Sequence, residues 1–273
     1  MKKSTCDKNS RWIFLVMLFT LHCSLFISPA RAQIGDYRNE LAVGFNGGLT
    51  MSNIGFTPTI PQNWLMGKTM GFSVRYTGEK YFNSICAIVA EVNYAQIGWE
   101  ERIWDLDDNP VINTITGLPE EYSRIIDYVQ VPLLARLGWG RERRGFQAFF
   151  QVGPQLGFYL SEKTEANFDL DHPNMHQRTS PVSGPDTDGN HYSNMYHMPV
   201  ENKLDYGIAG GAGLEFSNPH FGHIMIEGRY YFGLGNIYGN TKRDYFAKSN
   251  FGNIVIKATY LFDLMKSKNP KIK

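Results

Sequence analysis

The sequence predicts an all-β protein: an eight-stranded antiparallel transmembrane β-barrel with up-and-down topology, preceded by a cleaved signal peptide. Three observations support this prediction. The N-terminus has the features of an export signal, eight later segments alternate apolar and polar residues, and the connections between them alternate between short and long. Alternation with a period of two residues is typical of strands with one apolar face. Short turns at one end and long loops at the other are typical of barrels that span the bacterial outer membrane.

Residues 1–32 have the three parts of a secretory signal peptide. Four basic residues supply the positively charged start: Lys2, Lys3, Lys8 and Arg11. An apolar stretch follows at residues 12–27, and Ala-Arg-Ala at residues 30–32 gives the small-x-small pattern of a cleavage site. We therefore expect the mature chain to span residues 33–273, as one barrel with a short C-terminal periplasmic tail. An uncleaved anchor is the alternative, but a spanning helix needs about 20 apolar residues and this stretch is shorter.

The composition narrows the class of protein further. A net charge of +1 gives no field that would attract nucleic acid, so no such partner is expected. Aromatic residues make up 14% of the chain and there are 27 glycines, which suits short strands and turns. Of the three cysteines only Cys86 follows the predicted cleavage site, so we expect no internal disulfide in the mature chain.

The predicted strands begin near residue 41. They are eight segments with the period-two pattern, at residues 41–51, 70–77, 85–97, 126–139, 146–160, 204–216, 223–234 and 253–262. In the seventh, Ile224 belongs to an apolar face, and Glu227 and Arg229 belong to the other. Most segments are close to the 9–11 residues that a tilted membrane strand needs. Pro132 and Pro154 fall inside two segments, where we expect bulges or local strand ends, because proline cannot donate to a β-ladder.

Connection lengths predict the orientation of the barrel. Short turns lie at residues 78–84, 140–145 and 217–222, and the longest of the other connections covers residues 161–203. This alternation predicts that both termini and the short turns are periplasmic and that the long loops lie outside. Outward aromatic residues are expected where the barrel meets the two membrane interfaces. Near the short turns they are Tyr76, Trp139, Phe146, Phe216, Tyr260 and Phe262, and near the long loops Tyr94, Phe158, Tyr206, Tyr230 and Phe232.

The inward faces of the segments carry equal numbers of acidic and basic residues. These are Arg75, Arg136, Arg229 and Lys257, with Glu91, Asp205, Glu215 and Glu227. An eight-stranded barrel has room only for side chains in its interior, so we expect a neutralised polar network that fills the lumen and has a structural role. A proton or substrate relay through the lumen is the less favoured alternative. No catalytic residue, cofactor or bound metal is expected.

Four segments carry a resemblance to a known family. They are residues 128–134 (YVQVPLL), 152–157 (VGPQLG), 205–213 (DYGIAGGAG) and 227–237 (EGRYYFGLGNI). Together they resemble the PorT-like outer-membrane β-barrel proteins, which have an OmpA-type eight-stranded barrel domain, over most of the chain after Gln33. The resemblance implies a non-enzymatic barrel, and it includes both prolines. It also implies a link to type IX protein secretion, because the namesake is an accessory barrel of that machinery.

Two classes of function remain open. One is an accessory or partner-binding barrel, with outer-membrane lipid around it and other envelope or secretion-machinery proteins as partners. The other is a structural barrel that stabilises the membrane. An outer-membrane enzyme with a site at the outer mouth, involving Asp127 and Asp205, is less favoured. The sequence gives no oligomeric state.

Two groups of residues resemble metal ligands in type only. The long loop holds His172, His176, His191 and His197 among Asp169, Asp171, Asp186 and Asp188. Zinc or copper could use such ligands, but the spacings fit no known pattern, so a solvated loop is the favoured interpretation. Asp105, Asp107 and Asp108 are spaced like the start of a calcium loop, but the glycine and glutamate that it requires are missing.

Overall fold

The computed structural model describes residues 36–266, except 82, 106, 114, 142–143, 169, 171–195, 197 and 240–245. The predicted signal peptide and the last residues of the C-terminal tail lie outside the described residues. So do all four loop histidines and their neighbouring aspartates. In the described part of the chain, no helix is long and apolar enough to cross a membrane.

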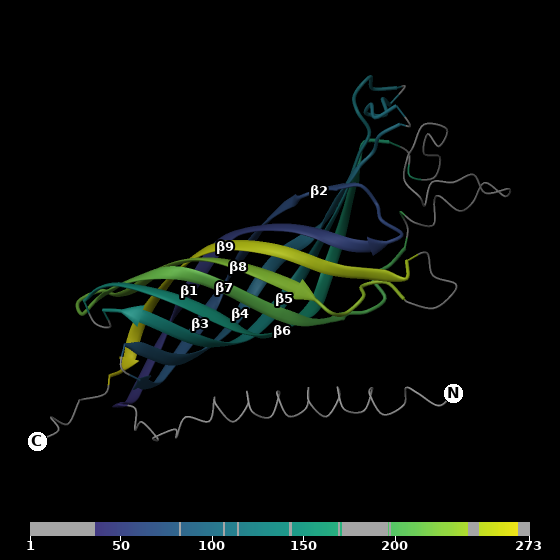
Figure 1. Cartoon of the computed structure of the whole chain (residues 1–273). Coiled ribbons are helices and arrows are strands. Elements are labelled where there is room, and N and C mark those ends of the chain that lie inside the picture. Colours follow the sequence, from purple (N-terminus) through teal and green to yellow (C-terminus); the bar gives the residue numbers. More distant parts are fainter. Residues whose placement is uncertain are drawn as a thin grey trace, which may run out of the picture. The chain divides into compact units, whose positions relative to one another are not determined.

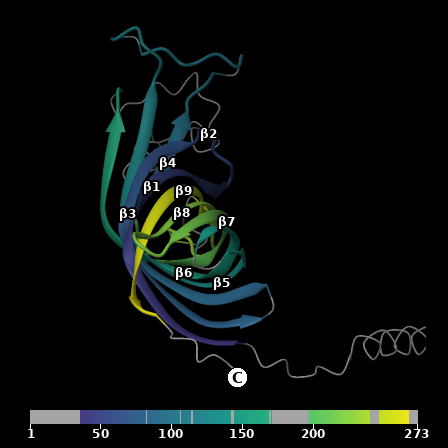
Figure 2. The same ribbon diagram turned by 90° about the vertical axis from the view of Figure 1, so that its left-hand side faces the viewer.

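The described residues form a closed antiparallel sheet, which confirms the predicted fold class. Its strands are β1 (Asp36–Thr57), β2 (Gln62–Asn63), β3 (Leu65–Tyr81), β4 (Ser84–Arg102), β5 (Glu121–Gly140), β6 (Gly145–Ala166), β7 (Leu204–Asn218), β8 (Gly222–Gly233) and β9 (Lys248–Met265). The order is β4-β3-β1-β9-β8-β7-β6-β5, and the pairing of β4 with β5 closes the ring (Figures 1 and 2). β2 pairs only with the far end of β4. The eight long strands are therefore the eight predicted segments, each of them longer than or close to its predicted length.

Outward side chains of the barrel are apolar and exposed. On β8, Ile224, Ile226, Tyr230 and Phe232 are exposed, and the side chains between them are buried. Most of the aromatic residues predicted to point outward are also exposed: Tyr76, Trp139, Phe146, Phe158, Tyr206, Tyr230, Phe232, Tyr260 and Phe262. Water-soluble proteins rarely expose an apolar surface of this extent, whereas lipid matches it.

One end of the barrel carries the short connections, and we call it the short-turn end. These connections are residues 82–83, 141–144 and 219–221. Gly145 and Gly222 flank two of them with φ angles of 119° and 94°, a backbone region that other residues rarely adopt. β1 starts and β9 finishes at the same end (Figure 1). The opposite end, which carries the longer connections, is the long-loop end.

The two prolines interrupt the ladder without shifting it, so the predicted bulges or strand ends at these positions were wrong. β5 and β6 run through Pro132 and Pro154, Pro132 still faces Gln155, and the register is the same on both sides of the interruption. Gly153 explains why: a Cβ atom there would lie 2.1 Å from the carbonyl oxygen of Leu133. The two backbones approach closely because glycine has no side chain, and the strands therefore need not bend.

Three strands continue past the rest of the barrel at the long-loop end. β7 begins at Leu204, which faces Phe158, so residues 159–166 of β6 pair with β5 alone among the strands. β4 and β5 extend equally far, and residues 103–120 connect them. We call these extensions of β4, β5 and β6 the projecting sheet, and residues 103–120 the lobe. Figure 1 shows the projecting sheet and the lobe beyond the ring of strands.

Candidate functional site

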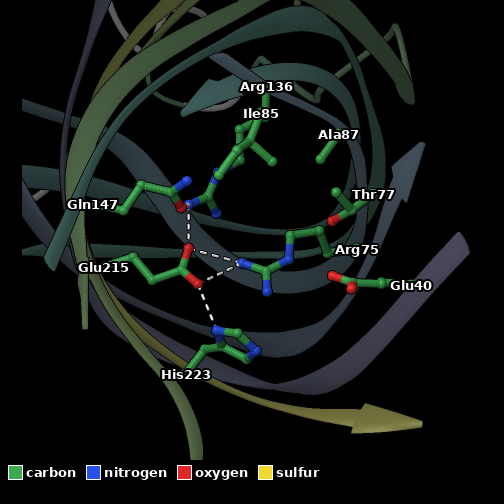
Figure 3. A pocket seen from close by; sticks show the side chains of 9 residues that line it. All are labelled: Glu40, Arg75, Thr77, Ile85, Ala87, Arg136, Gln147, Glu215 and His223. Carbon is green, nitrogen blue, oxygen red and sulfur yellow. Dashed lines mark hydrogen bonds and ion pairs between the residues drawn. The ribbon is translucent and has the colours of Figure 1, made fainter. Parts of the chain in front are cut away.

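Glu215 lies at the centre of a buried cluster near the short-turn end. Its carboxylate accepts hydrogen bonds from Arg75 Nη1, at 2.7 Å, and from Arg136 Nη2. Ser217 Oγ donates to Glu215 Oε1 at 3.0 Å, and His223 Nδ1 lies 2.6 Å from the same oxygen. Figure 3 shows the two arginines and the histidine converging on this carboxylate. Three cationic side chains therefore depend on one buried acid in this Glu215 cluster.

His223 is charged in this arrangement. Its other ring nitrogen, Nε2, lies 3.0 Å from Asp263 Oδ1. Because both nitrogens face carboxylate oxygens, both must donate, and a histidine that donates twice is an imidazolium ion. His223 is an addition to the charge network predicted from the sequence. Its position in the seventh segment could have indicated this role, because His223 shares the inward face with Glu227 and Arg229.

A small cavity, with about 20 Å³ of room for water, adjoins the Glu215 cluster. Arg75, Arg136, Glu215 and His223 line it, and Figure 3 places Glu40 on the side of Arg75. The polar lining groups mostly bind one another rather than pointing freely into the space. We therefore interpret the cavity as a solvated entrance to the packed lumen, where water can hydrate the charges.

A second charged cluster lies further from the short turns. Arg229 Nη1 and Nη2 lie 2.9 and 3.1 Å from the two oxygens of Glu91, and Nη2 lies 2.7 Å from Glu227 Oε1. Lys257 Nζ lies 2.5 Å from Glu91 and 3.3 Å from Glu227. Gln151 donates to Glu227 at 2.6 Å. Two acids and two bases thus neutralise each other in this Glu91–Glu227 cluster, as low-dielectric surroundings require.

Asp205 stands apart from both clusters. It accepts a hydrogen bond from the Tyr231 hydroxyl at 2.6 Å, and none of the described cationic side chains forms an ion pair with it. The structure thus brings seven of the eight predicted network residues together, in two groups, and separates the eighth. Without Asp205, the cations Arg75, Arg136 and His223 share Glu215, and Asp263 is a second acid partner for His223.

The lumen is polar only in part, which corrects the prediction of a polar lumen from the sequence. Its long-loop end is closed by an aromatic plug, to which the projecting sheet contributes two rings: Phe56, Trp99, Tyr122, Tyr196, Tyr238 and Phe246, all buried. The Phe56 ring lies 4.4 Å from Phe246 and 5.1 Å from Trp99, between centroids. Tyr196, Tyr238 and Phe246 come from the long connections, which bury apolar residues by docking them into the barrel mouth.

Polar atoms in the plug remain neutral. Burial raises the pKa of the Tyr122 and Tyr238 phenols above the usual range, so neither ionises at neutral pH. Glu101 and Arg124 are buried charged residues that border the plug, and Glu101 accepts from the Tyr196 hydroxyl at 3.0 Å. Arg124 donates to the Tyr238 hydroxyl at 3.0 Å and lies 2.8 Å from Glu162.

A filled lumen predicts that the barrel does not conduct ions. Water and ions would have to cross two salt-bridged layers and then the aromatic plug, and no open path is visible among the described residues. We expect the purified mature protein to give no stepwise conductance in planar lipid bilayers, with an established porin as the positive control. Regular single-channel steps that grow with salt concentration would contradict the filled-lumen interpretation.

A hydrolytic triad uses the same residue types as Ser217, His223 and Asp263. These three side chains lack the accessible nucleophile and the neutral histidine base that a triad needs. Ser217 Oγ lies 2.9 Å from His223 Nδ1, yet it is buried and donates its proton to Glu215. An imidazolium ion cannot accept that proton. The carboxylates named for an outer-mouth enzyme do not meet either, since Asp127 is on the outward face of β5 and Asp205 points inward.

The outward face changes from apolar to polar at one level of β4, β5 and β6. Asp127 accepts hydrogen bonds from the Tyr94 hydroxyl at 2.6 Å and from the Ser161 hydroxyl at 2.8 Å. Gln96 Nε2 lies 3.3 Å from the same carboxylate. We call Tyr94, Gln96, Asp127 and Ser161 the polar collar. It marks the level at which lipid contact ends on these strands, because polar groups on the outer face require water or headgroups.

The lobe above the collar exposes aliphatic side chains. Ile115 is 92% exposed, Leu118 61% and Ile112 44%. Asn113 holds this hairpin, since its Oδ1 accepts the amide of Ile115 at 2.8 Å and its Nδ2 donates to the carbonyl of Asn167 at 2.8 Å. The lobe is therefore a shaped element tied to β6. Asp105 in the lobe accepts the amides of Asp107 and Asn109, which is a turn motif.

Comparison with known proteins places this architecture among bacterial barrels. The family described as outer membrane protein beta-barrel domain matches residues 31–239. No curated protein matches the sequence significantly. The chain is similar to the solved structure of Ail, the attachment invasion locus protein of Yersinia pestis, with 14% identity and a TM-score of 0.31, over 82% of this chain and 99% of that one. The solved structure of OprG from Pseudomonas aeruginosa is also similar, with 12% identity and a TM-score of 0.34, over 84% of this chain and 98% of that one. For Neisserial surface protein A the identity is 7% and the TM-score is 0.34, over 81% of this chain and 97% of that one.

Proposed function

Because the chain belongs to the family of outer membrane protein beta-barrel domains, we propose that it is a sealed, non-enzymatic barrel that presents the lobe to a protein partner outside the cell. The barrel sits in the outer membrane. The orientation is part of the proposal: short turns and both termini in the periplasm, and the long-loop end outside. Its support is the general rule that outer-membrane barrels have short periplasmic turns and long external loops.

The exposed lobe is the observation that carries this proposal. The lumen is filled by ion pairs and aromatic rings, so its side chains are engaged in packing the barrel. The lobe, in contrast, holds Ile112, Ile115 and Leu118 in contact with solvent, far from the apolar band. Exposed aliphatic groups on a shaped hairpin are typical of a contact surface, because burying them against a partner is favourable.

Charge indicates which partner surface the lobe fits. Residues 103–120 include four carboxylates and no lysine, arginine or histidine. Such an element is repelled by anionic lipid surfaces. It fits a protein with an apolar pocket and a basic rim, because opposite charges around an apolar contact favour the correct encounter.

A role as an accessory barrel in type IX secretion is the more specific form of the proposal. Its support is the motif resemblance to PorT-like proteins at residues 128–134, 152–157, 205–213 and 227–237. A structural barrel that stabilises the membrane is the second candidate. It is favoured by the two buried charge clusters, which rigidify the wall without serving a ligand.

Photo-crosslinking in intact cells tests the proposal. A photoreactive amino acid at position 115 should form adducts with one defined protein, and the same probe at lipid-facing position 72 should label lipid only. The adduct should fall about tenfold or more when Ile112 and Leu118 are changed to serine, since lost anchor residues weaken contacts by 1–3 kcal/mol each. Ile112→Leu is the matched control, because it keeps the apolar surface.

The outcomes separate the candidates. A secretion component as the adduct supports the specific form, and another envelope protein supports the general form. Adducts with lipid alone at position 115 would favour the structural barrel and would contradict the partner-binding proposal.

A further inference from the structure

The polar collar lies between two lysines on the same outward face. Lys68 on β3 is exposed, one residue beyond Thr69, the last residue of β3 that pairs with β4. Lys163 on β6 is exposed, two residues beyond Ser161. Along the wall the order is thus Lys68 on β3, then the collar on β4, β5 and β6, with Lys163 on β6 above the collar's Ser161. Neighbouring strands are ~4.8 Å apart, so three spacings put the two lysines roughly 14 Å from each other.

The surface below the collar is suited to acyl chains. Met70 and Phe72 on β3, Val92 on β4, and Phe158 and Leu160 on β6 are all exposed apolar side chains. A molecule at this place would meet hydrocarbon on one side and hydrogen-bonding groups on the other. The two lysines would lie at the ends of its polar part. This is the environment of one amphiphile held upright against the barrel wall.

The collar supplies the groups that recognise hydroxyls. The Asp127 carboxylate can accept from hydroxyl groups, Gln96 can donate and accept, and Ser161 and Tyr94 each carry a hydroxyl. Lysines bind phosphate as point charges. We propose that this face binds one glycolipid of the outer leaflet whose sugar headgroup carries a phosphate at each end, with Lys68 and Lys163 on the phosphates and the collar on the sugar. The proposal shares only the orientation with the proposed function and needs neither the lobe nor its partner.

Native mass spectrometry of the mature protein released from detergent tests the site, with diphosphorylated lipid A as the probe. We expect one tightly retained lipid A. Lys68→Gln and Lys163→Gln should each weaken its binding about tenfold, the usual scale for one charge-assisted contact. Lys248→Gln is the matched control: it removes one exposed lysine at the same end of the barrel, but on β9, away from the collar.

The phosphate arrangement gives a second, sharper readout. With monophosphorylated lipid A, one of the two lysine substitutions should lose its effect and the other should keep it. Asp127→Ala should weaken both lipids equally, and phosphatidylglycerol should bind the wild type more weakly than either. Each variant is first shown to be folded by heat-modifiable gel mobility.

The proposal is overturned if Lys248→Gln weakens binding as much as Lys68→Gln, which would mean general charge attraction. It is also overturned if phosphatidylglycerol binds as tightly as lipid A. If lipid A does not bind at this site, crosslinking at position 115 is still expected. If position 115 gives no adduct, lipid A binding is still expected. The two proposals can therefore fail separately.

Discussion

Replacing Glu215 with glutamine is expected to destabilise the folded barrel by about 3–5 kcal/mol, the usual cost of removing one partner from a buried ion pair. Arg75, Arg136 and His223 all direct donors at this carboxylate. Without it, the two arginines keep their charge, because guanidinium does not lose its proton in proteins. His223 retains only Asp263 as an acid partner. The neutral amide can accept a hydrogen bond but cannot balance these charges.

Urea unfolding of the barrel refolded into lipid vesicles measures this loss, with tryptophan fluorescence as the signal. Glu165→Gln is the matched control, because its bridge to Lys163 is exposed to solvent and such pairs contribute about 0–1 kcal/mol. Combining Glu215→Gln with Arg75→Gln should cost less than the sum of the two single changes, since the pair is removed together. Equal unfolding midpoints for Glu215→Gln and Glu165→Gln would show that the cluster is not structural.

The sequence predicted the barrel well because lipid imposes a strict requirement on one face. Every second residue of a membrane strand must be apolar, so β8 could be recognised from Ile224 to Phe232 without any other information. The strand ends were less well predicted. Above the collar the outward residues of β5 are Ile125, Ser123 and Glu121, and this mixture no longer gives a clear period of two.

Prediction of the candidate sites from the sequence was limited for a different reason. Alternation tells which side chains point inward, but it does not tell their height in the lumen or their neighbour across it. The pattern therefore predicts Asp205 in one network with the basic residues, although Asp205 lies near the long-loop end beside Tyr231. The aromatic plug was missed for the same reason, since Trp99 and Tyr122 come from strand ends and Phe246 from a loop. Their shared burial depends on contacts that are distant in sequence.

Arg229→Leu is expected to cost about as much as Glu215→Gln, on the order of 3–5 kcal/mol, for the opposite reason. Arg229 holds both Glu91 and Glu227, and its loss leaves these two buried carboxylates with Lys257 alone. An uncompensated negative charge then remains inside the wall. The folded fraction on heat-modifiable gels should fall while expression stays the same, and the urea midpoint should drop.

A charge-balanced double variant separates lost pairing from lost packing. Arg229→Leu with Glu227→Gln removes one base and one acid, leaving Lys257 opposite Glu91 at 2.5 Å. We expect this variant to regain much of the stability, because replacing a buried ion pair by groups of no net charge is often neutral. Conductance should stay absent in both variants, since the aromatic plug does not depend on this cluster. If Arg229→Leu instead leaves the stability unchanged, water inside the lumen screens the charges. The Glu91–Glu227 cluster would then not have a structural role.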